Sequence, residues 1–256
     1  MLRLLLPLVS LFFLMLGMSA CNPTASQKED STKSAQTKST QIDAYLQSVQ
    51  ELHEIPGMAV AILQKGEVIY QNCLGVASLE NQTPLHAHHM LRVYSTTKLL
   101  SSTAIFQLIE QGKLSLEDPI TQYIDDIPLE WGKVSIGDML AHASGLPDII
   151  RYPDTTDEAL LELLIDDGFE FEPGQQFRYN QTNYWFLARI IQKVTGQTFA
   201  DFILEHQFPN GTSEALFSSN SQITIPNRIS KYEYDNQAQQ FVPTSYKAGA
   251  KGHAGN

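Results

Sequence analysis

The order of the periodic segments along the chain limits the folds that it can adopt. Two β-rich runs, 58–63 and 67–74, are joined by Gln64-Lys65-Gly66, which has the length and the glycine of a hairpin connection. A mainly helical stretch follows, and short β-like runs return beyond Thr212. Strands, then helices, then strands again predict an α+β fold with an antiparallel sheet.

Apolar residues that recur at helical spacing mark the expected helices. The first spans 42–53 and stops at Pro56-Gly57, and the second spans 95–111 and is closed by Gly112. Further helices are expected over 136–141, 157–165 and 184–194, and further strands over 223–225, 231–234 and 240–242.

The composition of the first twenty residues is that of a bacterial export signal. Arg3 precedes an apolar run over 4–16, which is too short for a membrane-spanning helix, and small residues stand before Cys21. The junction Met18-Ser19-Ala20-Cys21 resembles a lipobox, at which the cysteine is acylated and becomes the new N-terminus. We therefore expect residues 1–20 to be a lipoprotein signal peptide, with the protein lipid-anchored to the membrane of the cell envelope, on its periplasmic side, through Cys21. Asn22 then favours the outer membrane in a cell with two membranes, and simple secretion is the alternative.

The segment after the signal differs in composition from the rest of the chain. Residues 21–40 are mostly Ser, Thr, Gln and Lys, which bury too little apolar surface to fold, so we expect a disordered tether and then one domain over 41–256. Of all residues, 43% are hydrophobic and 18% are charged, which suffices for one core. The net charge of −11 argues against nucleic acid as a partner, because an acidic surface repels phosphates.

Ser95-Thr96-Thr97-Lys98 is a Ser-x-x-Lys sequence, placed where a loop turns into an apolar-faced helix. Residues three apart on a helix share a face, so the lysine amine can meet the serine hydroxyl. The helix N-terminus favours developing negative charge, so Ser95 can be deprotonated and attack a carbonyl. The same four residues also fit a helix N-cap followed by a solvated lysine, since a chain of this length holds about one such sequence by chance.

Longer segments around this motif resemble a known family. Residues 92–98 are similar to the nucleophile segment of the serine β-lactamase and penicillin-binding protein superfamily. Downstream, 138–147 (DMLAHASGLP) resembles the family's helix-ending LLxHTSGL segment, and 173–184 (PGQQFRYNQTNY) resembles its PGxxFxYSNTNY stretch. Val194-Thr195-Gly196 matches the end of the helix beyond. The resemblance implies a β-lactamase/transpeptidase-like fold, in which an antiparallel sheet is flanked by helices and accompanied by an all-helical subdomain. It places the chain in the branch that contains class C β-lactamases, carboxylesterases and D,D-peptidases.

The resemblance also implies the roles of four residues. Ser95 is the nucleophile, Lys98 is its activating partner, and Tyr179 is the base that takes the serine proton and later returns it to the leaving group. A cationic neighbour lowers the pKa of a phenol, as such a base requires. Gln181 stands where the family commonly has Asn, and it keeps an amide that can bind a substrate carbonyl or contact Lys98, although its additional methylene puts that role in question.

The implied function is that of a serine hydrolase that forms an acyl-enzyme on Ser95. Its substrate would be a β-lactam, a D-Ala-D-Ala peptide or a small ester, since the same Ser, Lys and Tyr serve all three. We expect a monomer that acts on a small-molecule or peptidoglycan-derived substrate, with no cofactor and no metal.

The histidines of the chain suggest two other sites. His86, His88 and His89 lack an accompanying H-E-x-x-H and fall in a predicted loop, so we do not expect them to bind metal. His142 and Ser144 suggest a serine–histidine pair, but the resemblance makes their segment a structural turn, in which Ser144-Gly145 suits a helix C-cap.

The family's third motif, Lys or His followed by Thr or Ser and then Gly on a strand of the sheet, has no convincing match. His253-Ala254-Gly255 has its outline but follows Tyr179 too closely, and 193–196 is a helix end. We therefore expect C-terminal strands of the sheet to be missing and the chain to be a truncated form of a longer hydrolase. The alternative from a different class is a non-catalytic envelope lipoprotein that retains part of the fold.

Overall fold

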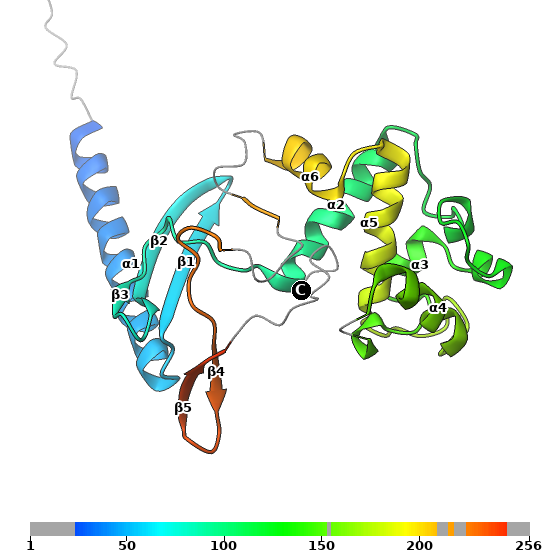
Figure 1. Cartoon of the computed structure of the whole chain (residues 1–256). Helices are drawn as coiled ribbons and strands as arrows, with labels where there is room; N and C mark the ends of the chain where they lie inside the picture. The colour runs from blue at the N-terminus through cyan, green and yellow to red at the C-terminus, as the bar shows by residue number, and fades with distance from the viewer. Residues whose placement is uncertain (1–23, 153–154, 209–214, 218–223, 245–256) are drawn as a thin grey trace, which may run out of the picture. The chain divides into compact units, whose positions relative to one another are not determined.

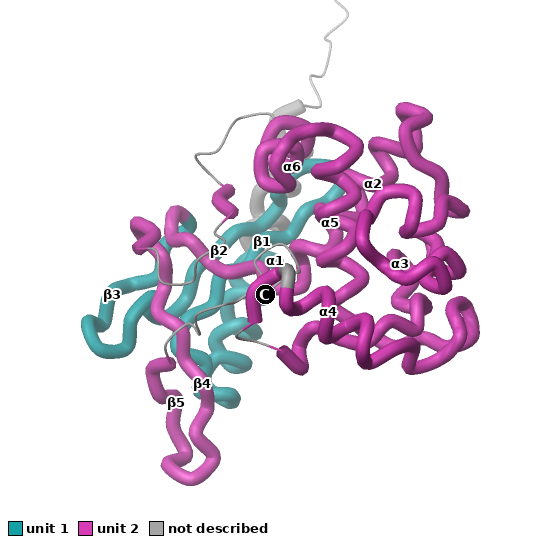
Figure 2. The backbone as a smooth tube through the Cα atoms, turned by 45° about the vertical axis from the view of Figure 1, so that its right-hand side comes forward, with its two compact units in different colours: residues 1–87 teal, residues 88–256 magenta. Residues whose placement is uncertain are grey.

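The computed structural model describes residues 24–152, 155–208, 215–217 and 224–244 (Figure 1). The chain divides into two compact units, residues 1–87 and 88–256, which Figure 2 shows in teal and magenta. Within the described ranges, no helix is both long and apolar enough to cross a membrane.

The first unit begins with a helix that is longer than the sequence predicts. Helix α1 spans Thr24–Leu52, whereas apolar periodicity predicts a helix only from Ile42 and a disordered tether over 21–40. The structure differs from the tether prediction over 24–40. This stretch contains neither Gly nor Pro and includes Gln, Lys, Glu and Ala, which are good helix formers even without an apolar face.

A three-stranded antiparallel sheet in the order β1-β2-β3 follows α1. Its strands are β1 (Gly57–Gln64), β2 (Glu67–Ser78) and β3 (Thr83–Pro84). Strands β1 and β2 pair around Lys65-Gly66, whose φ angles of 52° and 82° suit a two-residue hairpin loop, so the predicted hairpin is confirmed. The Asp43 carboxylate of α1 accepts hydrogen bonds from Tyr70 (2.6 Å) and Asn72 (2.8 Å) of β2, which fixes the helix to the sheet.

The second unit is helical from residue 94 to 207. Its helices are η1 (Tyr94–Thr96), α2 (Thr97–Glu110), η2 (Ile120–Gln122), η3 (Leu129–Lys133), α3 (Ile136–Leu140), η4 (Ile149–Arg151), α4 (Asp157–Asp167), α5 (Gln181–Thr195) and α6 (Phe199–Gln207). The helices predicted over 95–111, 136–141, 157–165 and 184–194 are confirmed. Helix α5 begins three residues earlier than predicted, because Asn180 caps it.

Helix α5 lies in the core of this unit. Trp185, Phe186 and Leu187 are fully buried on successive sides of the helix, and residues of α2, α3, α4 and α6 belong to the same core. Residues 181–188 of α5 are all buried, and a helix segment that is buried on all sides needs a packing partner on each side. The packing of α5 in this core therefore fixes the position of its N-terminal end.

Two strands follow the helices in the second unit, β4 (Tyr232–Asp235) and β5 (Gln240–Pro243), and they pair antiparallel. They confirm the strands predicted over 231–234 and 240–242. The strand predicted over 223–225 is wrong for Thr224 and Ile225, which are irregular because the following Pro226 cannot donate to a ladder, and residue 223 lies outside the described ranges.

Candidate active site

The turn that carries Ser95 precedes helix α2. Ser95 is exposed at the centre of η1, and α2 starts two residues later, so the serine stands just before the helix that the sequence predicts it to begin. Tyr94 has a φ of 45°, which is in the left-handed region that a bulky residue seldom adopts. Strained backbone of this kind is concentrated at functional sites, because the surrounding structure must hold it in place.

Lys98 lies one turn further on and is only 7% exposed. Its ammonium Nζ is 3.4 Å from Ser95 Oγ and donates a 2.6 Å hydrogen bond to Gln181 Oε1 at the start of α5. The rings of Tyr179 and Tyr184 lie 5.0 and 5.4 Å from Nζ, within the range of cation–π attraction. The lysine is thus a buried cation beside an exposed serine.

Tyr179 completes the arrangement from the segment before α5. Its hydroxyl is joined to Ser95 Oγ by a 2.6 Å hydrogen bond, and the side chain is 46% exposed. Burial raises the pKa of the phenol, but hydrogen bonds with Lys98 and Ser95, together with the positive charge of Lys98, outweigh it and leave the pKa below its usual value. A phenol with a lowered pKa is suited to accept the proton of Ser95.

The start of α5 is fastened to the segment 144–149. Asn180 caps the helix through its side-chain oxygen and donates from Nδ2 to Leu146 O at 2.6 Å. Thr182 donates to Pro147 O at 2.6 Å, and the Gln181 backbone N–H donates to Asp148 Oδ1 at 3.1 Å. These bonds fix the backbone positions from which the side chains of Tyr179 and Gln181 extend.

Ser144 and His142 belong to this scaffold. Ser144 is 1% exposed and donates to Asn183 Oδ1 at 2.5 Å, which agrees with its prediction as a structural residue. The helix C-cap predicted at Ser144-Gly145 is wrong: α3 ends at Leu140, and Ala141 is its cap. The reason is that the chain already turns at His142, whose φ is 56°.

The structure thus brings together the four residues that the resemblance to the family selects, Ser95, Lys98, Tyr179 and Gln181. Sequence reasoning missed Asp148 and Asn180, which position the start of α5. Their signal is that Asp and Asn are typical caps directly before a helical turn. Cys21 and His253-Ala254-Gly255 lie outside the described residues.

No group of three or more His, Cys, Asp or Glu in the described part of the chain is placed to hold a metal ion.

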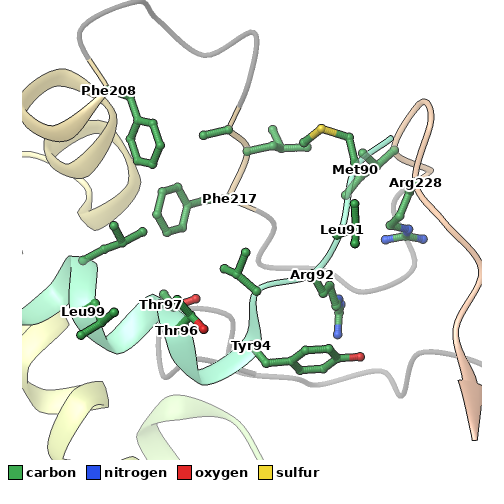
Figure 3. A pocket seen from close by; sticks show the side chains of 15 residues that line it. Met90, Leu91, Arg92, Tyr94, Thr96, Thr97, Leu99, Phe208, Phe217 and Arg228 are labelled. Atoms are coloured by element: carbon green, nitrogen blue, oxygen red, sulfur yellow. The ribbon is translucent and has the colours of Figure 1, made fainter. Parts of the chain in front are cut away.

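A cavity of about 360 Å³ lies on another side of the nucleophile turn (Figure 3). Tyr94, Thr96 and Thr97 contribute to its wall, while Val93, Phe208 and Phe217 are among the residues that make it apolar. The four site residues do not line it. It is therefore lined by sequence neighbours of Ser95 but not by the serine, lysine and tyrosine of the site.

A serine within reach of a buried lysine and a tyrosine, at the start of a packed helix, defines the Ser-x-x-Lys class of active-site serine proteins. Residues 42–255 match the model of the family described as Beta-lactamase. The chain belongs to this family.

Two curated relatives show how much of a family member the chain covers. It is 28% identical to penicillin-binding protein 4* of Bacillus subtilis (strain 168) over 210 residues, which are 78% of this chain and 46% of that protein. It is 25% identical to protein flp of Staphylococcus aureus (strain MW2) over 176 residues, 65% of this chain and 35% of that protein. The chain therefore spans less than half the length of these relatives.

Solved structures confirm the predicted fold. The octameric penicillin-binding protein homologue from Pyrococcus abyssi aligns with a TM-score of 0.69 at 22% identity, over 84% of this chain and 52% of that chain. EstCE1, a hydrolase with promiscuous acyltransferase activity, aligns with a TM-score of 0.67 at 23% identity, over 82% and 60%. The D-amino acid amidase from Ochrobactrum anthropi SV3, complexed with L-phenylalanine, aligns with a TM-score of 0.64 at 23% identity, over 77% and 58%. The fold is β-lactamase/transpeptidase-like.

Proposed function

We propose that the protein is a serine hydrolase that forms an acyl-enzyme on Ser95. The observation that carries the proposal is the convergence of three groups from two segments of the chain. Ser95 Oγ is 2.6 Å from the Tyr179 hydroxyl and 3.4 Å from Lys98 Nζ, and Lys98 is held by Gln181. A nucleophile, a base and a cation that favours the ionised base are three of the parts that acyl transfer uses.

The geometry supports a two-step reaction. Ser95 Oγ attacks the substrate carbonyl carbon while its proton passes to the Tyr179 oxygen, and the positive charge of Lys98 stabilises the phenolate beforehand. Tyr179 then returns the proton to the leaving amine or alcohol as the bond from carbon to nitrogen or oxygen breaks. Water attacks the carbonyl carbon of the resulting Ser95 ester and gives a proton to Tyr179. The bond from this carbon to Ser95 Oγ then breaks, Tyr179 returns the proton to Oγ, and the carboxylic acid product leaves.

The substrate class is a further part of the proposal. The relatives and neighbours include a penicillin-binding protein, a D-amino acid amidase and a hydrolase with acyltransferase activity. Their common chemistry is attack on an amide or ester carbonyl. We propose a β-lactam, a peptide ending in D-Ala-D-Ala or a small ester as the substrate, with a peptidoglycan-derived peptide favoured if the chain is anchored in the envelope. A monomer remains the expectation from sequence, although one structural neighbour is octameric.

Covalent labelling tests the nucleophile. We expect a fluorescent penicillin or a fluorophosphonate to add one probe to the wild-type chain and none to Ser95→Ala. Thr103→Ala is the matched control, because this exposed hydroxyl of α2 faces the Leu99 carbonyl, and it should label like the wild type. Label that is absent, or that persists in Ser95→Ala, contradicts the assignment. Reversible penicillin binding without any label would favour the non-catalytic alternative.

The proposed base is tested by removing one oxygen atom. Tyr179→Phe should slow labelling by about 10²- to 10⁴-fold, because general base catalysis contributes that much. Tyr45→Phe changes a 67% exposed tyrosine of α1 and serves as the control. Turnover of nitrocefin, a D-Ala-D-Ala peptide and a p-nitrophenyl ester then separates the three substrate classes.

A further inference from the structure

His142 contacts both the backbone and the side chain of the segment that presents Tyr179. The imidazole is 8% exposed, and its Nδ1 accepts a 3.1 Å hydrogen bond from the backbone N–H of Asn180, the residue directly after Tyr179. The Asn183 side-chain nitrogen lies 3.4 Å from the same Nδ1. Because Nδ1 accepts from the backbone, it carries no proton, so the ring is neutral with its proton on Nε2.

The ring of His142 also packs against the aromatic rings around the site. Its centroid lies 4.6 Å from that of Tyr179 and 5.2 Å from that of Tyr184, and Phe177 contacts it edge-on at 5.9 Å. A single side chain therefore limits both the position of the Asn180 backbone and the tilt of the Tyr179 ring. The phenol oxygen has little freedom, since displacement of the ring would lengthen its 2.6 Å contact with Ser95.

The charges around His142 favour its neutral form. Burial lowers the pKa of the imidazole, and the Lys98 cation on α2 lowers it further, while the Asp148 carboxylate before η4 and the backbone of Asn180 act in the opposite direction. The titratable groups that face it from α5 and the segment before it are the phenols of Tyr184 and Tyr179. The net pKa lies below the usual value for histidine.

We propose that His142 is a positioning residue for Tyr179, an inference that rests on the proposed function of Tyr179 as the base for Ser95. In the neutral form, Nδ1 holds the Asn180 N–H and the ring supports the phenol. When Nδ1 takes a proton, it faces the Asn180 N–H as donor against donor, and the support of Tyr179 is lost. The rate at which Ser95 is acylated then depends on the charge of His142, which acts through Tyr179.

Two substitutions separate the acceptor from the ring. His142→Asn places an amide oxygen near the position of Nδ1, tolerates the φ of 56°, and does not titrate. His142→Phe keeps an aromatic ring but cannot accept the Asn180 N–H. His206→Asn removes an exposed imidazole on α6 and is the matched control. The second-order rate of fluorophosphonate labelling at Ser95 is measured for each from about pH 5 to pH 8, which spans the titration of histidine.

We expect His142→Phe to label about tenfold or more slowly than the wild type at neutral pH, and His142→Asn to recover most of the rate. Relative to its own rate at neutral pH, the wild type should lose more activity in acid than His142→Asn does. Equal rates for wild type and His142→Phe, or superimposable pH profiles for wild type and His142→Asn, overturn the inference. If His142→Phe fails to fold, the profile of His142→Asn decides alone.

Nuclear magnetic resonance tests the positioning role of His142 independently of the proposed function. In wild-type protein, the imidazole nitrogens of His142 should show a proton on Nε2 alone at neutral pH, and the amide signal of Asn180 should shift as His142 titrates. A constant Asn180 signal overturns the positioning role whether or not Ser95 is labelled. Conversely, a chain that shows this coupling but is never labelled at Ser95 contradicts the proposed function alone.

Discussion

The Gln181 amide provides the buried ammonium of Lys98 with an oxygen acceptor that carries no charge. Both side chains are 7% exposed, and 2.6 Å separates the two polar atoms. A buried charge is costly unless it is hydrogen-bonded, and a carboxylate in this place would neutralise the cation. An amide supplies the hydrogen bond that the buried ammonium requires, and it leaves the charge of Lys98 available to Tyr179.

Removal of this amide should weaken the fold and the site together. In Gln181→Leu the lysine loses a charge-assisted hydrogen bond, so we expect the free energy of unfolding to fall by about 1–3 kcal/mol. Labelling of Ser95 should also slow, because Lys98 is no longer held at its distance from Ser95 and Tyr179. Denaturant titration measures the first effect. Gln192→Leu, at an exposed position of α5, is the control and should change neither quantity.

The neutral state of His142 makes stability depend on pH. The folded pKa is lowered, mainly by burial and then by Lys98, so the unfolded chain binds a proton at a higher pH than the folded chain does. The stabilisation is therefore complete above the unfolded value of about 6.5 and is lost as the pH falls through the lower folded pKa. Between these two values, the unfolding free energy of the wild type should fall more steeply than that of His142→Asn. Parallel curves for the two proteins would contradict this expectation.

Individual site residues could be selected from the sequence, but their contacts could not. Ser95, Lys98 and Tyr179 were found because their motifs occur in a fixed order along the chain. The sequence interpretation left open whether Gln181, with its additional methylene, could still reach Lys98, and the structure shows that it does. His142 was interpreted as structural alone, because nothing in a linear motif reveals that its ring lies against Tyr179.

Among the elements, the irregular segment 142–145 follows α3 and is hydrogen-bonded to the chain that precedes α5. Backbone hydrogen bonds join His142 O to the Arg178 N–H and Gly145 O to the Glu170 N–H, each at 2.8 Å. Gly145 has a φ of 71°, and any side chain there would overlap the backbone carbonyl of Phe171. This close approach requires glycine, and it sets the distance between the two segments that carry His142 and Tyr179.

Alanine substitutions at two glycines separate the free-energy cost of losing the close approach at Gly145 from the cost of a left-handed backbone. Gly112, which closes α2, has a similar φ of 69° but no atom within 4 Å of the place where a side chain would lie. Gly112→Ala should cost only the left-handed conformation, about 1–2 kcal/mol. Gly145→Ala must also push the Phe171 backbone away, so we expect a loss of about 3–5 kcal/mol in thermal or denaturant unfolding. Equal losses of unfolding free energy for the two variants would show that the Phe171 backbone can move away from position 145 at no cost in free energy.

The elements themselves were largely predictable where apolar residues recur with one period. Helices α2, α3, α4 and α5 follow such a pattern, and so does the hairpin of β1 and β2, whereas α6 and the short η helices were not predicted. The start of α1 was not predictable in this way, because residues 24–40 have no apolar periodicity and their helical state depends on intrinsic propensity. Residues 224–225 show the opposite case, in which a β-rich composition is overruled by the following Pro226.

At the scale of the whole molecule, the four site residues all belong to the second compact unit, 88–256. The family match covers 42–255, while the chain spans 46% of the Bacillus relative. Arrangement of the serine, lysine and tyrosine thus depends on contacts among η1, α2, α5 and the segment 142–149, all of which are within the described residues. Charge has a further effect at this scale, since a net −11 opposes binding to polyanions.

Attachment to the membrane is a property of the whole chain that the two cysteines can test. We propose that Cys21 is acylated after removal of residues 1–20, whereas Cys73, on β2, is half-buried and has no such sequence before it. On expression in a bacterium with its own export signal, the wild type and Cys73→Ala should enter the detergent phase on phase separation and incorporate labelled fatty acid. Cys21→Ala should do neither, because the acyl chains supply the apolar surface that the polar residues 24–40 lack. Equal partitioning of Cys21→Ala and wild type would instead favour simple secretion or another mode of attachment.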